Sequence, residues 1–106
     1  MNENYTVKIE PEALNDIQDI IIWYNKQKSG LGERFHKTII SQIDSLNKNP
    51  HLYRIRYKQI RCVLANKFPY MVHYYINEEV KLVEVLAVIS TDRNPKIWSE
   101  KSRKRQ

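Results

Sequence analysis

Few residues of this chain could bind a metal ion, and they are far apart in the sequence. The three histidines are His36, His51 and His73, and the only cysteine is Cys62. Zinc sites in small domains are built from cysteines and histidines at short, regular spacings, which this chain lacks. We therefore expect no metal site and no disulfide, and nothing in the sequence indicates a cofactor.

His73 is the one residue whose type fits acid–base catalysis. A histidine titrates near neutral pH and is suited to act as a general base. The alternative is a structural role, in which His73 lies on a sheet face beside Met71 and Tyr75 and pairs with a tyrosine hydroxyl or water. We favour the structural role. Cys62 alternates with apolar neighbours, which indicates a buried thiol rather than a nucleophile.

A continuous positive segment is the second feature with chemical meaning. Residues 45–77, here called the basic strip, contain six lysines and arginines and no aspartate or glutamate. The six are Lys48, Arg54, Arg56, Lys58, Arg61 and Lys67. Aromatic residues alternate with these charges, and such surfaces bind nucleic acid or an acidic, amphipathic protein segment. The alternative is a solvated face without a ligand.

Length and composition indicate one domain over residues 1–106, with a basic tail over residues 99–106. A net charge of +6 with 42% hydrophobic residues and only two glycines excludes disordered and low-complexity classes. The single cysteine fits a reducing cytosol. The N-terminus lacks a secretory signal pattern, and the longest apolar run, residues 85–89, is too short to cross a bilayer. We expect a cytoplasmic protein without a membrane partner.

Hydrophobic spacing predicts a strand and two helices in the first half of the chain. Alternating residues predict a strand over residues 5–9, and apolar residues at three- and four-residue spacing predict a helix from Pro11 to about Lys28. Both glycines of the chain follow, and a second helix runs from Leu31 to Leu46. Because the connection is short, the helices should form an antiparallel hairpin. Trp23 and Tyr24 are adjacent, so one of them should be exposed to a partner.

The pattern of apolar residues in the second half of the chain predicts strands. Residues 53–64 read as a strand with a bend or bulge near Gln59, where the apolar parity changes. Residues 70–76 and 80–89 follow as a hairpin, and the all-apolar run 85–89 indicates burial on both faces. A short helix or tail begins at Asn94. The order β-α-α-β-β-β predicts an α+β fold in which a helical hairpin packs on a small antiparallel sheet.

This order and several short strings resemble the RelE/ParE superfamily of type II toxins, the small basic partners in toxin–antitoxin pairs. The strings keep their order and spacing over residues 5–98, nearly the whole chain. They are Asp19-Ile20, Trp23-Tyr24, Leu31-Gly32-Glu33-Arg34-Phe35, Leu46, Asn49-Pro50, Ile60-Arg61, Phe68-Pro69-Tyr70, Tyr74, Val85-Leu86-Ala87-Val88, Arg93-Asn94-Pro95 and Trp98.

The resemblance implies one of two activities. Members like RelE bind the ribosomal A site and cleave messenger RNA there, whereas members like ParE lack that chemistry and are associated with poisoning of DNA gyrase. RelE-like nucleases have an arginine where this chain has Met71, and end in a tyrosine or a histidine–tyrosine pair where it has Trp98. An indole cannot act as acid or base. RelE-like nucleases also have basic residues in the turn after the last strand, where this chain has Ser90-Thr91-Asp92 and then only Arg93. The ParE-like class fits better.

We predict a ParE-like toxin of the plasmid-stabilisation type, which binds an essential bacterial target, DNA gyrase as first choice, without catalysis. The resemblance implies a cognate antitoxin whose C-terminal segment folds into the groove between helical hairpin and sheet. The residues expected to contact the target or the antitoxin are Arg54, Arg56, Lys58, Arg61, Arg93 and Trp98.

Two other functions stay open at this stage. One is a ribosome-dependent messenger RNA endonuclease, in which Lys58, Arg61 and Arg93 would hold the phosphate and His73 would move the proton. The other is a non-toxic module that binds nucleic acid through the basic strip.

Overall fold

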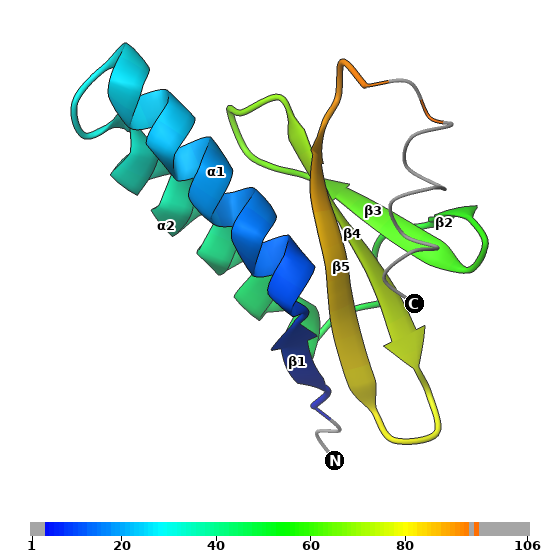
Figure 1. The fold of residues 1–106 in the computed structure, drawn as a ribbon. Coiled ribbons are helices and arrows are strands. Elements are labelled where there is room, and N and C mark those ends of the chain that lie inside the picture. Colours follow the sequence, from blue (N-terminus) through cyan, green and yellow to red (C-terminus); the bar gives the residue numbers. More distant parts are fainter. Residues whose placement is uncertain (1–3, 94, 96–106) are drawn as a thin grey trace.

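The computed structural model describes residues 4–93 and residue 95 (Figure 1). Its elements are β1 (Thr6–Ile9), α1 (Pro11–Gln27), α2 (Leu31–Asp44), β2 (Ile55–Tyr57), β3 (Ile60–Leu64), β4 (Tyr70–Asn77) and β5 (Leu82–Ser90), with one 3₁₀ turn at Ser45–Asn47. The basic tail, and all of the predicted final helix or tail except Pro95, lie outside the described residues. In the part that the structure describes, no helix combines the length and apolar character needed to cross a membrane.

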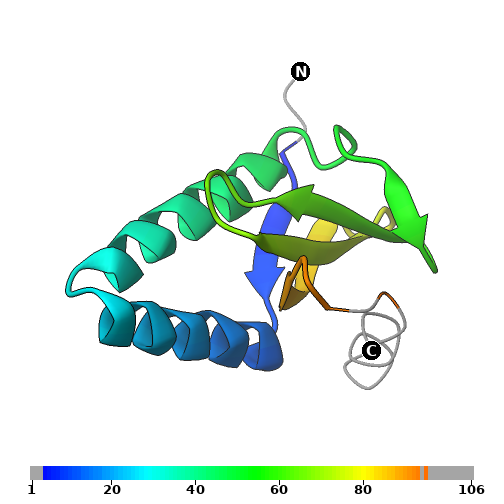
Figure 2. The same cartoon turned by 90° about the horizontal axis from the view of Figure 1, so that it is seen from above.

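The five strands form one mixed sheet in the order β1-β5-β4-β3-β2. The two helices lie together on one side of it (Figures 1 and 2), so the predicted α+β fold with a helical hairpin on a small sheet is confirmed. The sheet departs from the expected antiparallel arrangement at β1, which runs parallel to β5. No tight turn joins these two strands, so nothing forces them to run in opposite directions.

The two helices follow the predicted apolar spacing. In α1 the buried residues are Ala13, Ile17, Ile20 and Tyr24. In α2 and the turn after it they are Gly32, Phe35, Ile39, Ile43 and Leu46. Pro11 is the first residue of α1, where its missing amide hydrogen costs nothing. Three- and four-residue spacing places each set on one helix face, which packs against the sheet.

The junction of the helical hairpin depends on two glycines with different roles. Gly30 has φ +87°, a left-handed conformation that starts α2 and that residues with a side chain rarely adopt. Gly32 lies where α1 and α2 approach closely: a Cβ atom there would come within 2.5 Å of the Ile21 carbonyl oxygen. The Gly32 amide donates to Asn25 Oδ1 at 2.8 Å, which adds a bond between the helices.

The segment predicted as one bent strand is a hairpin of two strands. Lys58 and Gln59, with φ of 43° and 66°, form a two-residue turn between β2 and β3. Positive φ at both central positions is the geometry that matches the twist of a tight hairpin. The change of apolar parity near Gln59 therefore marks a reversal of the chain. As a consequence the element order gains one strand, β-α-α-β-β-β-β.

Strand β5 buries side chains on both faces of the sheet, as predicted for residues 85–89. A bulge at Leu86 interrupts its pairing with β4, since His73 pairs with Ala87 and Tyr74 with Val85. The extra residue in β5 reverses the face of the sheet to which the side chains after the bulge point. Val85 and Val88 therefore both join the core beneath the helices. Ala87 and Ile89 belong to a second cluster, with Tyr57 and Met71, on the opposite face.

Candidate functional site

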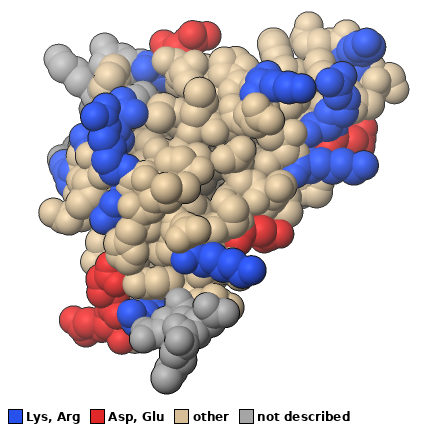
Figure 3. All heavy atoms as spheres, turned by 180° about the vertical axis from the view of Figure 1, so that it is seen from behind, with Lys and Arg blue, Asp and Glu red and all other residues tan. Residues whose placement is uncertain are grey.

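Four of the six cations of the basic strip lie on or beside the β2–β3 hairpin. Arg54 precedes β2, Arg56 is in β2, and Lys58 is in the turn; all three are exposed. Figure 3 shows that basic side chains on one face of the molecule form separate groups with uncharged surface between them. Arg54, Arg56 and Lys58 are thus presented on the surface of the molecule.

Arg61 is held differently from its neighbours, because it also connects parts of the fold. Its guanidinium donates to the Tyr53 carbonyl oxygen at 2.7 Å, which fastens the segment before β2 to β3. Arg61 pairs with Tyr74 and therefore shares the face of the sheet that Tyr74 occupies. Burial raises the pKa of the Tyr74 hydroxyl, and the charge of Arg61 opposes that shift. The Tyr74 hydroxyl donates to the Pro50 carbonyl oxygen at 2.6 Å.

His73 lies on the opposite face of the sheet and is fully buried. Its Nδ1 is 2.9 Å from the Tyr57 hydroxyl and 3.3 Å from the Cys62 sulfur. His73 thus pairs with a tyrosine hydroxyl, as its structural interpretation predicts. Cys62 is a buried free thiol as predicted, and burial raises its pKa to about 11, which leaves it protonated and unreactive at neutral pH.

The structure does not bring the four residues of the nuclease alternative together. Arg61 and His73 point to opposite faces of the sheet. Lys58 lies in the turn before β3, whereas Arg93 follows the end of β5 that pairs with the start of β4. These positions are at opposite ends of the sheet, because Ile60 pairs near the end of β4 and Leu64 near its start. Trp98 lies outside the described residues.

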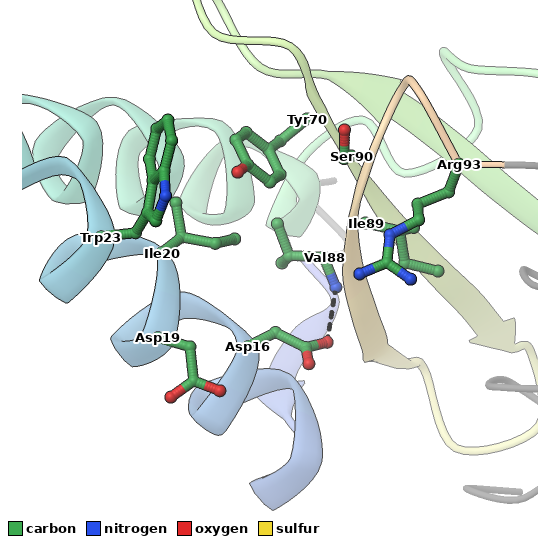
Figure 4. Close-up of a pocket in the computed structure, with 9 residues that line it drawn as sticks. All are labelled: Asp16, Asp19, Ile20, Trp23, Tyr70, Val88, Ile89, Ser90 and Arg93. Atoms are coloured by element: carbon green, nitrogen blue, oxygen red, sulfur yellow. Dashed lines mark hydrogen bonds between the residues drawn. The ribbon is translucent and has the colours of Figure 1, made fainter.

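A groove of about 260 Å³ lies between α1 and the free end of β5 (Figure 4). From α1 it is lined by Asp16, Asp19, Ile20 and Trp23, and from the sheet by Tyr70, Val88, Ile89, Ser90 and Arg93. Trp23 is 52% exposed whereas Tyr24 is buried, so the prediction that one of this pair faces outward is confirmed. Burial raises the pKa of the Tyr70 hydroxyl, an effect that Arg93 partly opposes. The groove combines an acidic rim, an apolar wall and one cation.

Asp16 connects the two walls of this groove. Its Oδ2 accepts a hydrogen bond of 3.0 Å from the backbone amide of Val88 in β5 (Figure 4). This role of Asp16 was not predicted, because Asp16 is 72 residues from Val88 in the sequence. One signal was available: Asp16, Asp19 and Trp23 recur at three- and four-residue spacing beside the core stripe of α1.

The pKa values of two other carboxylates, Glu78 and Glu84, are shifted. Glu78 accepts hydrogen bonds from the Tyr5 hydroxyl at 2.8 Å and from His51 at 2.6 Å, and these bonds lower its pKa. Burial, followed by the charge of Glu10, raises the pKa of Glu84. Both carboxylates lie near the end of the sheet that holds β1, away from the groove. Among the described residues, no three histidine, cysteine, aspartate or glutamate side chains come together as metal ligands.

The sequence matches the family model for the ParE toxin of the type II toxin–antitoxin system parDE over residues 7–95. The chain therefore belongs to the ParE toxin family and is a type II toxin of the RelE/ParE superfamily. No curated protein matches the sequence.

Solved structures share the fold at low sequence identity. A chain of the chromosomal ParDE system of P. aeruginosa is 13% identical with a TM-score of 0.74, covering 83% of this chain and 97% of its own. A mutant of E. coli toxin RelE in the free state is 14% identical with a TM-score of 0.70, covering 95% and 97%. The RelBE2 complex of Mycobacterium tuberculosis gives 20% identity and a TM-score of 0.61, covering 82% and 98%.

Proposed function

We propose that this toxin acts by binding an essential bacterial target, with DNA gyrase as first choice, and not by cleaving RNA. The burial of His73 beneath Tyr57 carries this proposal. RNA cleavage at a 2′-hydroxyl requires a group that removes the proton and a group that protonates the leaving oxygen. A general base must reach the proton it abstracts, and a side chain with no exposed surface cannot reach a bound RNA.

The cations of the chain support the same proposal. Lys58 and Arg93 lie at opposite ends of the sheet, and Arg61 is engaged with the Tyr53 carbonyl. One phosphate cannot contact cations that are separated by the length of a strand, since each residue of a strand adds about 3.3 Å. Spread over a surface, the same charges suit a large partner, where they accelerate association and select against wrong partners.

In the cell the toxin is held inactive by a cognate antitoxin. The neighbouring folds include ParDE and RelBE toxin–antitoxin complexes, which supports a partner of this kind. The exposed Arg54, Arg56 and Lys58 favour an acidic antitoxin segment that folds on binding.

Conditional expression in a bacterial host tests the proposal. We expect growth arrest, covalent gyrase–DNA complexes and DNA breaks, with messenger RNA ends at codon positions unchanged from an empty-vector control. Co-expression of the protein encoded by the adjacent reading frame should restore growth. The proposal fails if translated messenger RNAs are cut at codon-linked positions and the cuts disappear in His73→Ala. A Lys58→Ala variant serves as a second test of cleavage, because the Lys58 side chain is exposed and its removal leaves the buried core unchanged.

A further inference from the structure

A second cleft lies at the other end of the sheet from the groove beside α1. It has a volume of about 280 Å³ and lies between the β2–β3 hairpin and the turn that joins β4 to β5. Its lining includes Ile55 and Arg61 from the hairpin, Tyr75 and Ile76 from β4, and Glu78 and Glu79 from the turn. Tyr70 at the start of β4 lines the groove, whereas Ile76 near its end lines the cleft, a separation of about 20 Å at ~3.3 Å a residue. The two surfaces can therefore contact different partners.

The acidic wall of the cleft is held in place by the rest of the fold. The Tyr5 hydroxyl donates to one carboxylate oxygen of Glu78 at 2.8 Å, and His51 bonds the other at 2.6 Å. The Glu79 amide donates to Asn77 Oδ1 at 3.1 Å, which fixes the backbone of the turn. The carboxylate of Glu79 is exposed and has no hydrogen bond or ion pair within the described part of the chain. Glu79 is thus a positioned anion that can receive a cation from a partner.

The opposite wall of the cleft offers apolar surface. Ile55 lies in the edge strand β2 and is 44% exposed, and the half-buried Tyr75 lines the same cleft. The bond from Arg61 to the Tyr53 carbonyl at 2.7 Å fastens this wall to the loop before β2. Because both walls are held before any partner arrives, little side-chain ordering opposes binding.

The charges around the cleft have both signs, and this indicates the class of partner. Gln59 lines the cleft next to the exposed Lys58, and Glu79 lines it from the turn. A nucleic acid carries only negative charge, so Lys58 would attract it and Glu79 would repel it. An acidic antitoxin segment meets the same repulsion at Glu79. A protein surface with a lysine or arginine beside an apolar side chain matches the cleft on every wall.

We propose that this cleft binds the protein target of the toxin, with a lysine or arginine of the target against Glu79 and an apolar side chain against Ile55 and Tyr75. This inference rests on the proposed function, because the target is the partner named there. An enzyme that acts on DNA fits the cleft, since proteins that bind DNA present lysine and arginine on their surface.

The probe for the test is purified DNA gyrase holoenzyme with linear DNA, titrated with the purified toxin. Glu79→Lys should weaken binding about tenfold, because it places like charges against each other. The matched control is Asp44→Lys, which changes the net charge equally on an exposed residue of α2 outside the cleft and should have little effect. Ile55→Ala should weaken binding about fivefold. Its control is Leu14→Ala, since Leu14 in α1 is 46% exposed and does not line the cleft.

Two further measurements identify the partner of the cleft. The protein encoded by the adjacent reading frame should bind Glu79→Lys at least as tightly as the wild type, which also shows that the variant is folded. If it binds Glu79→Lys as poorly as gyrase does, the cleft belongs to the antitoxin and the inference is overturned. A gain in binding to the DNA alone by Glu79→Lys, where Asp44→Lys shows none, assigns the cleft to nucleic acid and also overturns it.

The remaining outcomes separate this inference from the proposed function. If gyrase binds the wild type and binds Glu79→Lys and Ile55→Ala as tightly as their controls, the cleft is not the target surface and the proposed function stands. If gyrase does not bind the wild type, both are overturned.

Discussion

Substituting alanine for Gly32 should separate the two helices and destabilise the toxin. An added Cβ would lie 2.5 Å from the Ile21 carbonyl oxygen and 2.7 Å from the Asn25 side chain, whereas ordinary contact begins at 3.4 Å. The backbone atom is about 0.9 Å too close and cannot rotate away as a side chain can. The helices must therefore move apart at this contact.

The magnitude follows from three contributions. Overpacking of a close contact costs about 1–3 kcal/mol, and the backbone clash places this site at the upper end. Displacement of Asn25 removes its hydrogen bond to the Gly32 amide, which costs about 1 kcal/mol. Alanine gains about 1 kcal/mol over glycine inside a helix. The expected net loss in the free energy of unfolding is about 2–3 kcal/mol, a large part of the total for a small domain.

Gly30→Ala provides the control, because a Cβ at Gly30 would meet nothing within 4 Å. Its cost comes from the left-handed backbone alone and should be about 1 kcal/mol. Urea unfolding followed by far-ultraviolet circular dichroism gives both values by linear extrapolation. The reasoning is refuted if Gly32→Ala unfolds within about 0.5 kcal/mol of the wild type, or if Gly30→Ala is the more damaging change.

Three further predictions concern turns and titrating groups. Replacing Lys58-Gln59 by Asn-Gly should stabilise the toxin by about 1 kcal/mol in urea unfolding, because both residues have positive φ. Glu84→Gln should raise Tm at neutral pH, since burial and Glu10 penalise the charged carboxylate. The gain should fade as pH falls through the raised pKa of Glu84 and should be absent below pH 4.5, where Glu84 is protonated in the folded and the unfolded chain. Glu78→Gln should lower Tm at neutral pH, because the lowered pKa of Glu78 marks a stabilised carboxylate. That difference should shrink as pH falls below 4.5 through the lowered pKa, and thermal melts from about pH 7 to about pH 3 test both signs.

The helices could be predicted from the sequence because their signals are local. Three- and four-residue apolar spacing and Pro11 place both ends of α1 within one residue of the structure. The β2–β3 turn could not be predicted from the sequence. Tight hairpin turns favour asparagine and glycine, and this turn is built from Lys58 and Gln59. The parallel pairing of β1 was also inaccessible, since nothing near Thr6 specifies Leu82 as its partner.

The candidate site, like the fold, could be predicted from the sequence only in part. The alternation of Cys62 with apolar neighbours was enough to predict a buried thiol, and His73 was predicted to pair with a tyrosine hydroxyl or water on a sheet face, but its complete burial was not predicted. The family resemblance implied a groove between the helical hairpin and the sheet, but the residues that line it were not predicted, because its two walls meet only in the folded chain. Arg61 looked like a surface cation, but its bond to the Tyr53 carbonyl depends on where the preceding loop lies.

The position of β1 has a consequence for when the toxin can complete its fold. Thr6 pairs with Leu82 and Ile9 with Val85, so the first strand made by the ribosome has no neighbour until nearly all of the chain has been synthesised. Such long-range pairing forms slowly, because the loop must close before the contact can stabilise it. A chain that stops before Leu82 therefore cannot pair β1 with β5 and lacks the complete sheet.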